Sequence, residues 1–230
     1  MRIAIVTSKG SWKSDYLWEL TKHWTANGHS VTTVYGAQEI PRGDLLFVLG
    51  CTFILPPEIL SRNKHNLVVH ESELPKGRGW TPIAWLVEGG SNRIPLTMIE
   101  AEKRVDAGPV YLRSEVVLDG HELMDEIRAL VMQEIIRMCK RFVEHYEEVV
   151  SMARDQEGEA TYFPRRNRES SRLNPDKTIA EQFDKLRIVD NQSYPAFFDY
   201  RGKRYTLKIE KAETVRGERV EDKPAGKTGG

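Results

Sequence analysis

Short runs of β-branched residues alternate with helix-patterned segments over residues 1–70, and this alternation constrains the fold more than any other feature. The first run, Arg2–Thr7, reads as a buried strand that ends in Ser-Lys-Gly. Further strands are expected at residues 31–35, 44–49 and 66–69, with helices at 15–26 and 57–62. Strand–helix alternation is typical of α/β folds, so we expect a Rossmann-like, mostly parallel sheet with helices on both faces.

The remainder of the chain is expected to complete this domain and to add a small appendage. After a Gly- and Pro-rich loop at 71–81, we expect a helix at 82–88, strands at 94–100 and 109–117, and a long helix at 121–150. The main domain would therefore span 1–150, followed by a polar, Arg-rich linker at 151–177. A helix at about 178–189 and a β-hairpin around Arg201-Gly202 would form an appendage over 178–212. Residues 213–230 are expected to be a disordered tail.

Composition narrows the classes of partner. The 34 basic and 34 acidic side chains cancel, which argues against a nucleic-acid partner but not against a local basic pocket for a phosphate. Cys51 and Cys139 lie in unrelated patterns, so neither a disulfide framework nor a metal site is expected. No apolar stretch approaches the roughly 20 residues needed to cross a bilayer, and Met1 leads directly into an apolar run without a basic leader. We therefore expect a soluble, cytoplasmic protein with no membrane partner.

Two polar residues are expected at strand ends, where open α/β sheets bind ligands. His70 directly follows the strand at 66–69, and Asp106 lies 36 residues later at another strand edge, in Val105-Asp106-Ala107-Gly108. The two side chains could meet as an Asp–His pair that takes part in catalysis. From position alone, a structural histidine and an aspartate that caps a turn remain open as alternatives.

The segment that begins at His70 carries a more specific signal. His70-x-Ser72-x-Leu74-Pro75-x-x-Arg78-Gly79-x-x-Pro82 resembles the H-x-S-x-L-P-x-x-R-G-x-x-P signature of the 10-formyltetrahydrofolate transferases. Thr97-Met98 and residues 105–108 resemble the second signature of that family. Residues 44–57 (DLLFVLGCTFILPP) resemble the strand and loop that line its folate pocket. The similarity extends from Met1 to about Tyr205.

This resemblance implies an enzyme that transfers a formyl group from 10-formyltetrahydrofolate to an amine. His70 would donate to the oxygen that gains negative charge and would shuttle a proton. Asp106 would fix the histidine ring and accept the proton that leaves the amine. The folate pocket would be formed by Thr52, Phe53, Ile54, Leu55, Arg78 and Gly108, of which the apolar members could equally be ordinary core.

Within the family, the chain is most similar to the sugar N-formyltransferases, on the form LPKGRGW and on residues 160–166 and 194–197. This implies a nucleotide-linked amino sugar as acceptor, used in surface polysaccharide biosynthesis. Contacts to that acceptor are expected from Lys9, Ser11, Trp12 and Trp80. The neutral, abbreviated appendage argues against the tRNA substrate of methionyl-tRNA formyltransferase, which has a larger C-terminal domain. The helix at 121–150 or the final hairpin could pair subunits into a homodimer.

One residue departs from the family pattern. The family places an asparagine two residues before the histidine, where its amide helps to hold the developing oxyanion, but Val68 occupies that position here. Asn66 lies roughly 13 Å from His70 along an extended strand, too far to substitute without a bulge. Three alternatives therefore stay open beside the amino sugar: another amine, hydrolysis of the formyl donor, and a relative that binds folate or nucleotide without turnover.

Overall fold

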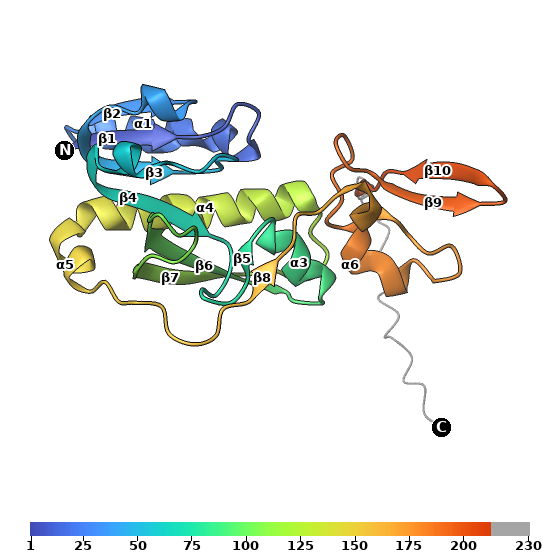
Figure 1. The fold of residues 1–230 in the computed structure, drawn as a ribbon. Coiled ribbons are helices and arrows are strands. Elements are labelled where there is room, and N and C mark those ends of the chain that lie inside the picture. The colour runs from blue at the N-terminus through green and yellow to red at the C-terminus, as the bar shows by residue number, and fades with distance from the viewer. Residues whose placement is uncertain (213–230) are drawn as a thin grey trace.

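A six-stranded sheet forms the body of the molecule in the computed structural model, which describes residues 1–212; the expected disordered tail, 213–230, lies outside the described residues (Figure 1). The strand order is β2-β1-β3-β4-β6-β7. Four strands are parallel: β1 (Arg2–Val6), β2 (Ser30–Val34), β3 (Gly43–Val48) and β4 (Asn63–His70). β6 (Arg93–Glu100) and β7 (Val110–Val117) extend the sheet in antiparallel fashion. The predicted mostly parallel α/β fold is confirmed.

Helices cover both faces of the sheet, as the alternation of strand and helix predicts. α1 (Leu17–Ala26) and α4 (Met124–Glu144) pack on one face against Ile3 and Ile5, whereas α2 (Pro57–Leu60) packs on the other against Ala4 and Val6. Alternate residues of β1 thus enter opposite cores, as the two-residue period of a strand requires. Among the described residues, no helix is both long and apolar enough to span a membrane.

The predicted helix at 121–150 is wrong in its bounds, because the chain forms two helices. The side chain of Glu122 instead organises the preceding turn, accepting from the backbone N–H of Asp119 (2.6 Å) and Gly120 (2.9 Å). α4 therefore begins only at Met124 and ends at Glu144. His145 leaves the helical region, with φ −116° and ψ 37°, and α5 (Tyr146–Ser151) follows it.

The segment expected to be a linker is packed against the main domain. It contains β8 (Tyr162–Phe163), which pairs in parallel with β5 (Arg78–Gly79) from the loop that follows His70. β5 leads into α3 (Pro82–Glu88), which lies next to the appendage in Figure 1. Residues 154–163 therefore lie along the loops that follow β4 and β6, whereas Arg172 and Leu173 pack on the appendage.

The appendage confirms the predicted hairpin but not the predicted helix. β9 (Ala196–Tyr200) and β10 (Lys203–Leu207) are joined by Arg201 and Gly202, both at positive φ (48° and 70°), as a two-residue hairpin turn requires. The helix expected at 178–189 is only a 3-10 turn and the short α6 (Phe183–Leu186). That 3-10 turn is Ala180–Gln182, and the other described 3-10 turns lie at Trp12–Tyr16, Ala37–Glu39 and Arg168–Ser171. The domain boundaries and the homodimer stay predictions.

Candidate functional site

His70 ends β4 at the carboxyl edge of the parallel strands, and its side chain is buried. The loop that follows turns back over the ring, so that the Nε2 atom of His70 lies 2.9 Å from the carbonyl oxygen of Gly77. A carbonyl can only accept, so this nitrogen carries the proton and donates it. The ring is therefore held by its own signature loop.

Asp106 approaches the other nitrogen of the ring from the loop between β6 and β7. Its Oδ1 atom lies 3.7 Å from Nδ1 of His70, and both side chains are about nine-tenths buried. Its Oδ2 atom accepts from the backbone N–H of Gly79 at 3.0 Å. The structure thus brings together the two residues that the sequence places at separate strand ends. Asp106 thus presents one carboxylate oxygen to Nδ1 of His70 while its other oxygen is anchored to the signature loop.

The two ends of the loop that carries Asp106 lie close together, because the backbone of Glu100 passes directly beside Gly108 and Pro109. The N–H of Glu100 donates to the carbonyl of Pro109 at 3.0 Å, and a Cβ added at Gly108 would lie 2.0 Å from the carbonyl oxygen of Glu100. Glycine is required there by this close approach. Asn66 also binds Glu100. Its side-chain amide donates to the carboxylate of Glu100 (3.2 Å) and to the carbonyl of Leu60 (3.1 Å). Asn66 is therefore turned away from His70, in agreement with the distance expected from the sequence.

We predict that Gly108→Ala lowers turnover at least about tenfold and destabilises the fold by about 1–3 kcal/mol, as overpacking of a rigid site does. The added methyl group collides with backbone and must displace the Asp106 loop. Gly89→Ala is the matched control, because Gly89 has a negative φ and its Cβ would meet the nearest backbone atom at 3.2 Å. Melting curves and turnover measure both effects; equal behaviour of the two variants would contradict the prediction.

A buried ion pair lies next to the His–Asp pair. Lys13 binds the carboxylate of Glu71, the residue after His70, and both side chains are about nine-tenths buried. Burial acts to raise the pKa of Glu71, but Lys13 and then His70 lower it more, so the pKa falls below its ordinary range. The pair ties the turn after β1 to the end of β4. Lys13 was not singled out from the sequence, where a lone lysine in a polar turn gives no signal of burial.

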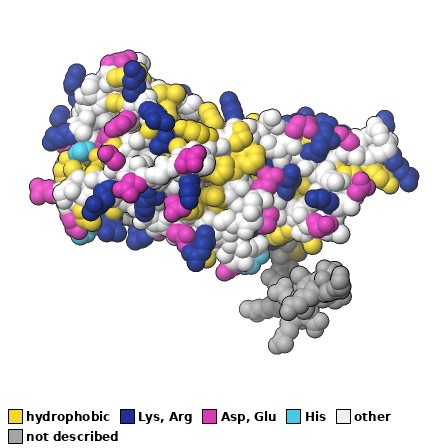
Figure 2. Space-filling model, turned by 60° about the horizontal axis from the view of Figure 1, so that its bottom comes forward, with side chains coloured by type: hydrophobic (Ala, Val, Ile, Leu, Met, Phe, Trp, Pro, Cys, Tyr) yellow, Lys and Arg dark blue, Asp and Glu magenta, His cyan; other side chains and the backbone are white. Residues whose placement is uncertain are grey.

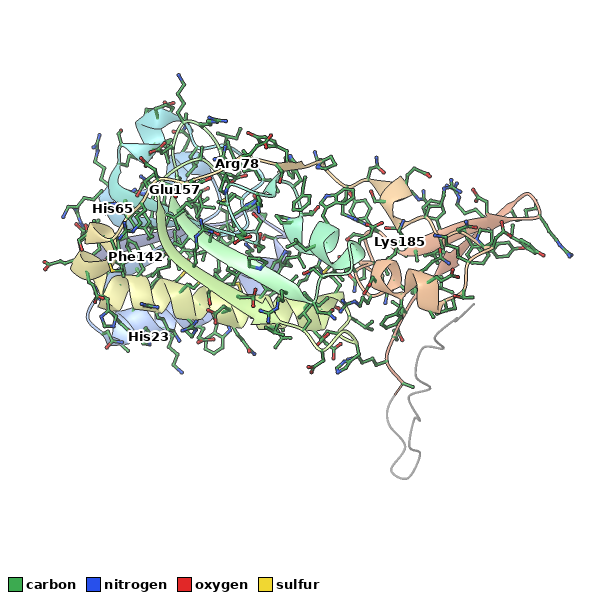
Figure 3. The ribbon with its side chains drawn as sticks, turned by 90° about the horizontal axis from the view of Figure 1, so that it is seen from below. His23, His65, Arg78, Phe142, Glu157 and Lys185 are labelled. Carbon is green, nitrogen blue, oxygen red and sulfur yellow. The ribbon has the colours of Figure 1, made fainter. Side chains whose placement is uncertain are left out.

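The residues expected to line a folate pocket divide into exposed and buried groups. Ile54 is 70% exposed and Phe53 half-buried, whereas Leu55 belongs to the core beneath α2. The backbone N–H of Thr52 donates to the hydroxyl of Ser8 at 2.9 Å, which joins the ends of β3 and β1. Arg78 is buried and donates to Gln156 at 2.6 Å. Figure 3 shows Arg78 on the same side of the body as Glu157, the neighbour of Gln156.

The residues expected to contact an acceptor also differ in their exposure to solvent. Lys9 and Trp80 are exposed, and the guanidinium of Arg165 lies 4.9 Å from the centroid of the Trp80 ring. Ser11 caps the turn at Trp12–Tyr16, its hydroxyl accepting from the N–H of Lys13 at 3.4 Å. Trp12 is half-buried against the main core. Lys9 and Trp80 are thus the members of this group with the most accessible surface.

A cavity of about 420 Å³ opens beside the His–Asp pair. It is lined by Pro75, Arg78, Arg104, Ala107 and four residues of the 155–160 segment. The hydroxyl of Tyr162 lies 3.5 Å from Arg104, and its pKa is lowered by Arg104 and by Arg78. Two guanidinium groups therefore give the cavity a cationic side that suits a carboxylate or phosphate.

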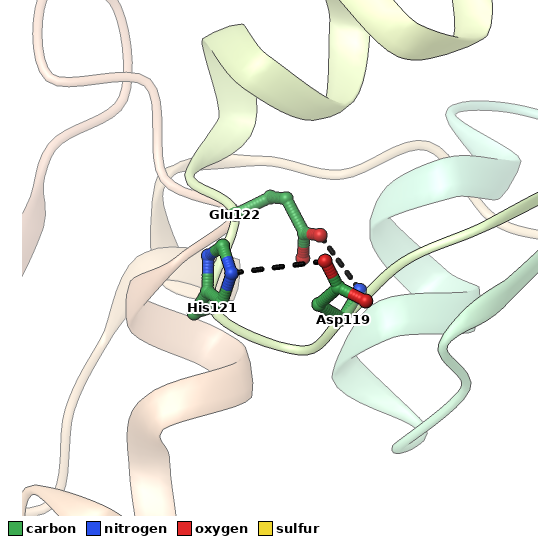
Figure 4. A group of neighbouring side chains, drawn as sticks. All are labelled: Asp119, His121 and Glu122. Carbon is green, nitrogen blue, oxygen red and sulfur yellow. Dashed lines mark hydrogen bonds and ion pairs between the residues drawn. The ribbon is translucent and has the colours of Figure 1, made fainter.

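One side-chain cluster outside this region has a composition that could hold a metal ion. Asp119, His121 and Glu122 lie together before α4 (Figure 4). Glu122 is already bonded to two backbone N–H groups of the turn, and the guanidinium of Arg187 lies 3.6 Å from it. These contacts give Glu122 a structural role, since it caps the turn before α4.

The chain belongs to the formyl transferase family, because the family model matches residues 2–137, more than half of the sequence. Among curated proteins, it is 31% identical to methionyl-tRNA formyltransferase from Thermotoga neapolitana over 151 residues, which cover 65% of this chain and 48% of that one. It is 28% identical to methionyl-tRNA formyltransferase from Thermodesulfovibrio yellowstonii, covering 71% of this chain and 53% of that one. The chain spans about half the length of these relatives.

Solved structures share the fold. Methionyl-tRNA formyltransferase from Clostridium thermocellum has a TM-score of 0.77 at 24% identity and covers 95% of each chain. A 4-N formyltransferase from Francisella tularensis has a TM-score of 0.69 at 17% identity, covering 92% of this chain and 98% of that one. HypX from Aquifex aeolicus, in complex with tetrahydrofolic acid, has a TM-score of 0.76 at 20% identity and covers 91% and 37% of the two chains. These structures show the fold that the chain shares, whereas the family model over residues 2–137 confirms the resemblance to the formyltransferases.

Proposed function

We propose that this chain is a formyltransferase that moves a formyl group from 10-formyltetrahydrofolate to the amine of a nucleotide-linked amino sugar. The observation that carries the proposal is the buried pair of His70 and Asp106, which lie 3.7 Å apart at the sheet edge. Both residues lie inside the region that matches the family, residues 2–137. A buried acid–base pair at the ligand-binding edge of the sheet is suited to general acid–base catalysis of acyl transfer.

The roles of the two side chains follow from their contacts. Bound 10-formyltetrahydrofolate would supply the formyl carbon. Nε2 of His70 would exchange its bond to the Gly77 carbonyl for one to the oxygen that gains negative charge. Once it points at that oxygen, such a donor typically lowers the barrier by a few kcal/mol. Asp106, anchored by the N–H of Gly79, would keep the ring oriented and accept the proton that leaves the attacking amine. The bond between the formyl carbon and the folate nitrogen would then break, with the proton passed through His70 to that nitrogen, which leaves as tetrahydrofolate.

The neighbouring strand edge offers a wall that fits the flat rings of a folate. Ile54 exposes 70% of a branched apolar side chain beside half-buried Phe53, just beyond β3. Ligand sites commonly combine such apolar surface with a few fixed polar groups. Arg78 donates to Gln156, and Gly108 lies against the backbone of Glu100. We therefore assign both residues to the support of the pocket and not to direct contact with the folate.

The distribution of charge favours a small acceptor over a tRNA. The net charge is zero, and basic and acidic side chains are interspersed on the face shown in Figure 2. In the appendage, Asp199 pairs with both Arg172 and Arg204. Binding a tRNA surface needs an excess of uncompensated lysine and arginine. Trp80 with Arg165 offers instead an aromatic and cationic pair for a sugar, base or phosphate.

Formylation of an aminoacylated tRNA is the second candidate. It is favoured by the sequence identity of 28–31% to curated methionyl-tRNA formyltransferases. The two candidates differ in the acceptor alone, so one experiment separates them.

We predict that the purified protein, supplied with 10-formyltetrahydrofolate, adds one formyl group to a UDP-, dTDP-, GDP- or CMP-linked amino sugar. Mass spectrometry of a panel of such sugars, with methionyl-tRNA in parallel, measures the product. His70→Ala is the control and should form no product. Formylation of the tRNA alone would overturn the sugar assignment, and formylation of neither would favour another amine or a binding protein.

A further inference from the structure

The segment at 153–163 runs beneath both loops of the His–Asp pair. Arg154 exchanges two backbone hydrogen bonds with Val110, at 2.7 and 3.0 Å, at the start of β7. Thr161 then accepts from Gly77 through its hydroxyl (2.8 Å) and from Arg78 through its carbonyl (2.9 Å). This segment, which we call the strap, therefore touches the Asp106 side at one end and the His70 side at the other.

The side chain of Gln156 binds both the loop that carries Asp106 and the loop that follows His70. Its Nε2 atom donates to the carbonyl oxygens of Asp106 (3.0 Å) and Gly108 (2.9 Å), while its Oε1 atom accepts from Nη2 of Arg78 (2.6 Å). Both N–H groups of the amide are used, and its oxygen is bound to a cation. An amide is the side chain that can donate twice and accept at once from this position.

These contacts act on the atoms that set the geometry of the pair. Asp106 has a positive φ of 55°, a conformation that is strained for a residue other than glycine and persists where its surroundings hold it. Gln156 holds the carbonyl of Asp106 itself. On the other side it holds Arg78, which lies between Gly77, bonded to His70, and Gly79, bonded to Asp106. The distance between His70 and Asp106 thus depends on two loops that Gln156 links.

We propose that Gln156 is a positioning residue for the His70–Asp106 pair, and that the strap thereby determines whether the pair can act. This inference rests on the proposed function for its effect on turnover, but its effect on the geometry of His70 can be measured without any reaction. The strap also forms one wall of the cavity beside the pair.

Gln156→Met is the direct test, since it keeps the length of the side chain and removes all three hydrogen bonds. We expect kcat to fall about 10- to 100-fold, the range seen when reacting groups are misplaced by about 1 Å, with KM for the acceptor changed much less. Gln156→Glu keeps an acceptor for Arg78 but sets a carboxylate against two carbonyls, so it should lose as much. Glu157→Gln, an exposed neighbour, is the matched control and should keep the kcat of the wild type.

The reaction-free readout is the pair of ¹⁵N resonances of the His70 ring, assigned by their loss in His70→Asn. We expect Gln156→Met to change these resonances and their pH titration in the same direction as Asp106→Asn does, and Glu157→Gln to leave them unchanged. Resonances and titration identical to the wild type in a folded Gln156→Met protein would overturn the inference. Absence of formyl transfer in the wild type, with the resonances changed as expected, would contradict the proposed function and leave the inference supported.

Discussion

Asp106→Asn is expected to lower the kcat of formyl transfer by about 10²- to 10⁴-fold, the contribution typical of a positioned acid–base group. Asparagine has nearly the same shape and can still accept from the N–H of Gly79, so the loop should keep its place. It removes the negative charge that faces Nδ1 of His70 and the group that takes the proton from the amine. The loss should therefore appear in turnover and not in folding.

Steady-state kinetics and a melting curve on the same preparation separate these effects. Asp176→Asn is the matched control, since Asp176 is an exposed carboxylate that does not line the cavity, and the same chemical change there should alter kcat by less than a few-fold. Turnover of Asp106→Asn within a few-fold of the wild type would remove Asp106 from the mechanism.

Glu71→Gln is expected to destabilise the fold by about 3–5 kcal/mol, the cost of leaving one member of a buried ion pair without its partner. The ammonium group of Lys13 would then be buried with no carboxylate, and the connection between the turn after β1 and the end of β4 would be lost. Replacing both residues by methionine should recover most of the stability, because no buried charge remains. Urea denaturation of the two variants measures the difference.

The same carboxyl group predicts a dependence on pH. The pKa of Glu71 in the folded protein lies below its ordinary value of 4.5. Its contribution is therefore fully present above that value and is lost as the pH falls through the folded pKa. We expect the melting temperature of the wild type to decline more steeply below pH 4.5 than that of Glu71→Gln. Parallel profiles for the two proteins would contradict this assignment.

The strands were predictable where apolar residues crowd into short runs, and less so where polar residues join them. β4 begins at Asn63, earlier than expected, because Asn63 and His65 pair with β3 although their polar side chains are not typical of a strand. The break at His145 was missed because helical periodicity continues across it. The predicted helix at 178–189 was too long because tertiary contacts, including those of buried Arg187 with Asn92 and Glu122, fix this segment instead.

The site was predictable to the level of residues but not of geometry. A histidine and an aspartate at strand ends, together with the family signature, were enough to expect that they meet. The bond from Nε2 to Gly77 and the anchoring of Asp106 by Gly79 depend on how the signature loop folds back, which no residue pattern specifies. The position of Gln156 could not be predicted, because it lies in a polar stretch that is typical of a linker and a single glutamine there belongs to no helical or strand pattern.

The fate of a labelled formyl group is the most direct test of the central claim, that the His70–Asp106 pair transfers formyl from folate to an amine. The protein would be incubated with 10-[¹³C]formyltetrahydrofolate and the amino-sugar panel, and the label followed by NMR in the wild type and in Asp106→Asn. The account predicts label on the amine of one sugar in the wild type and almost none in the variant. Label that appears as formate, or that stays on the folate despite binding, would contradict it.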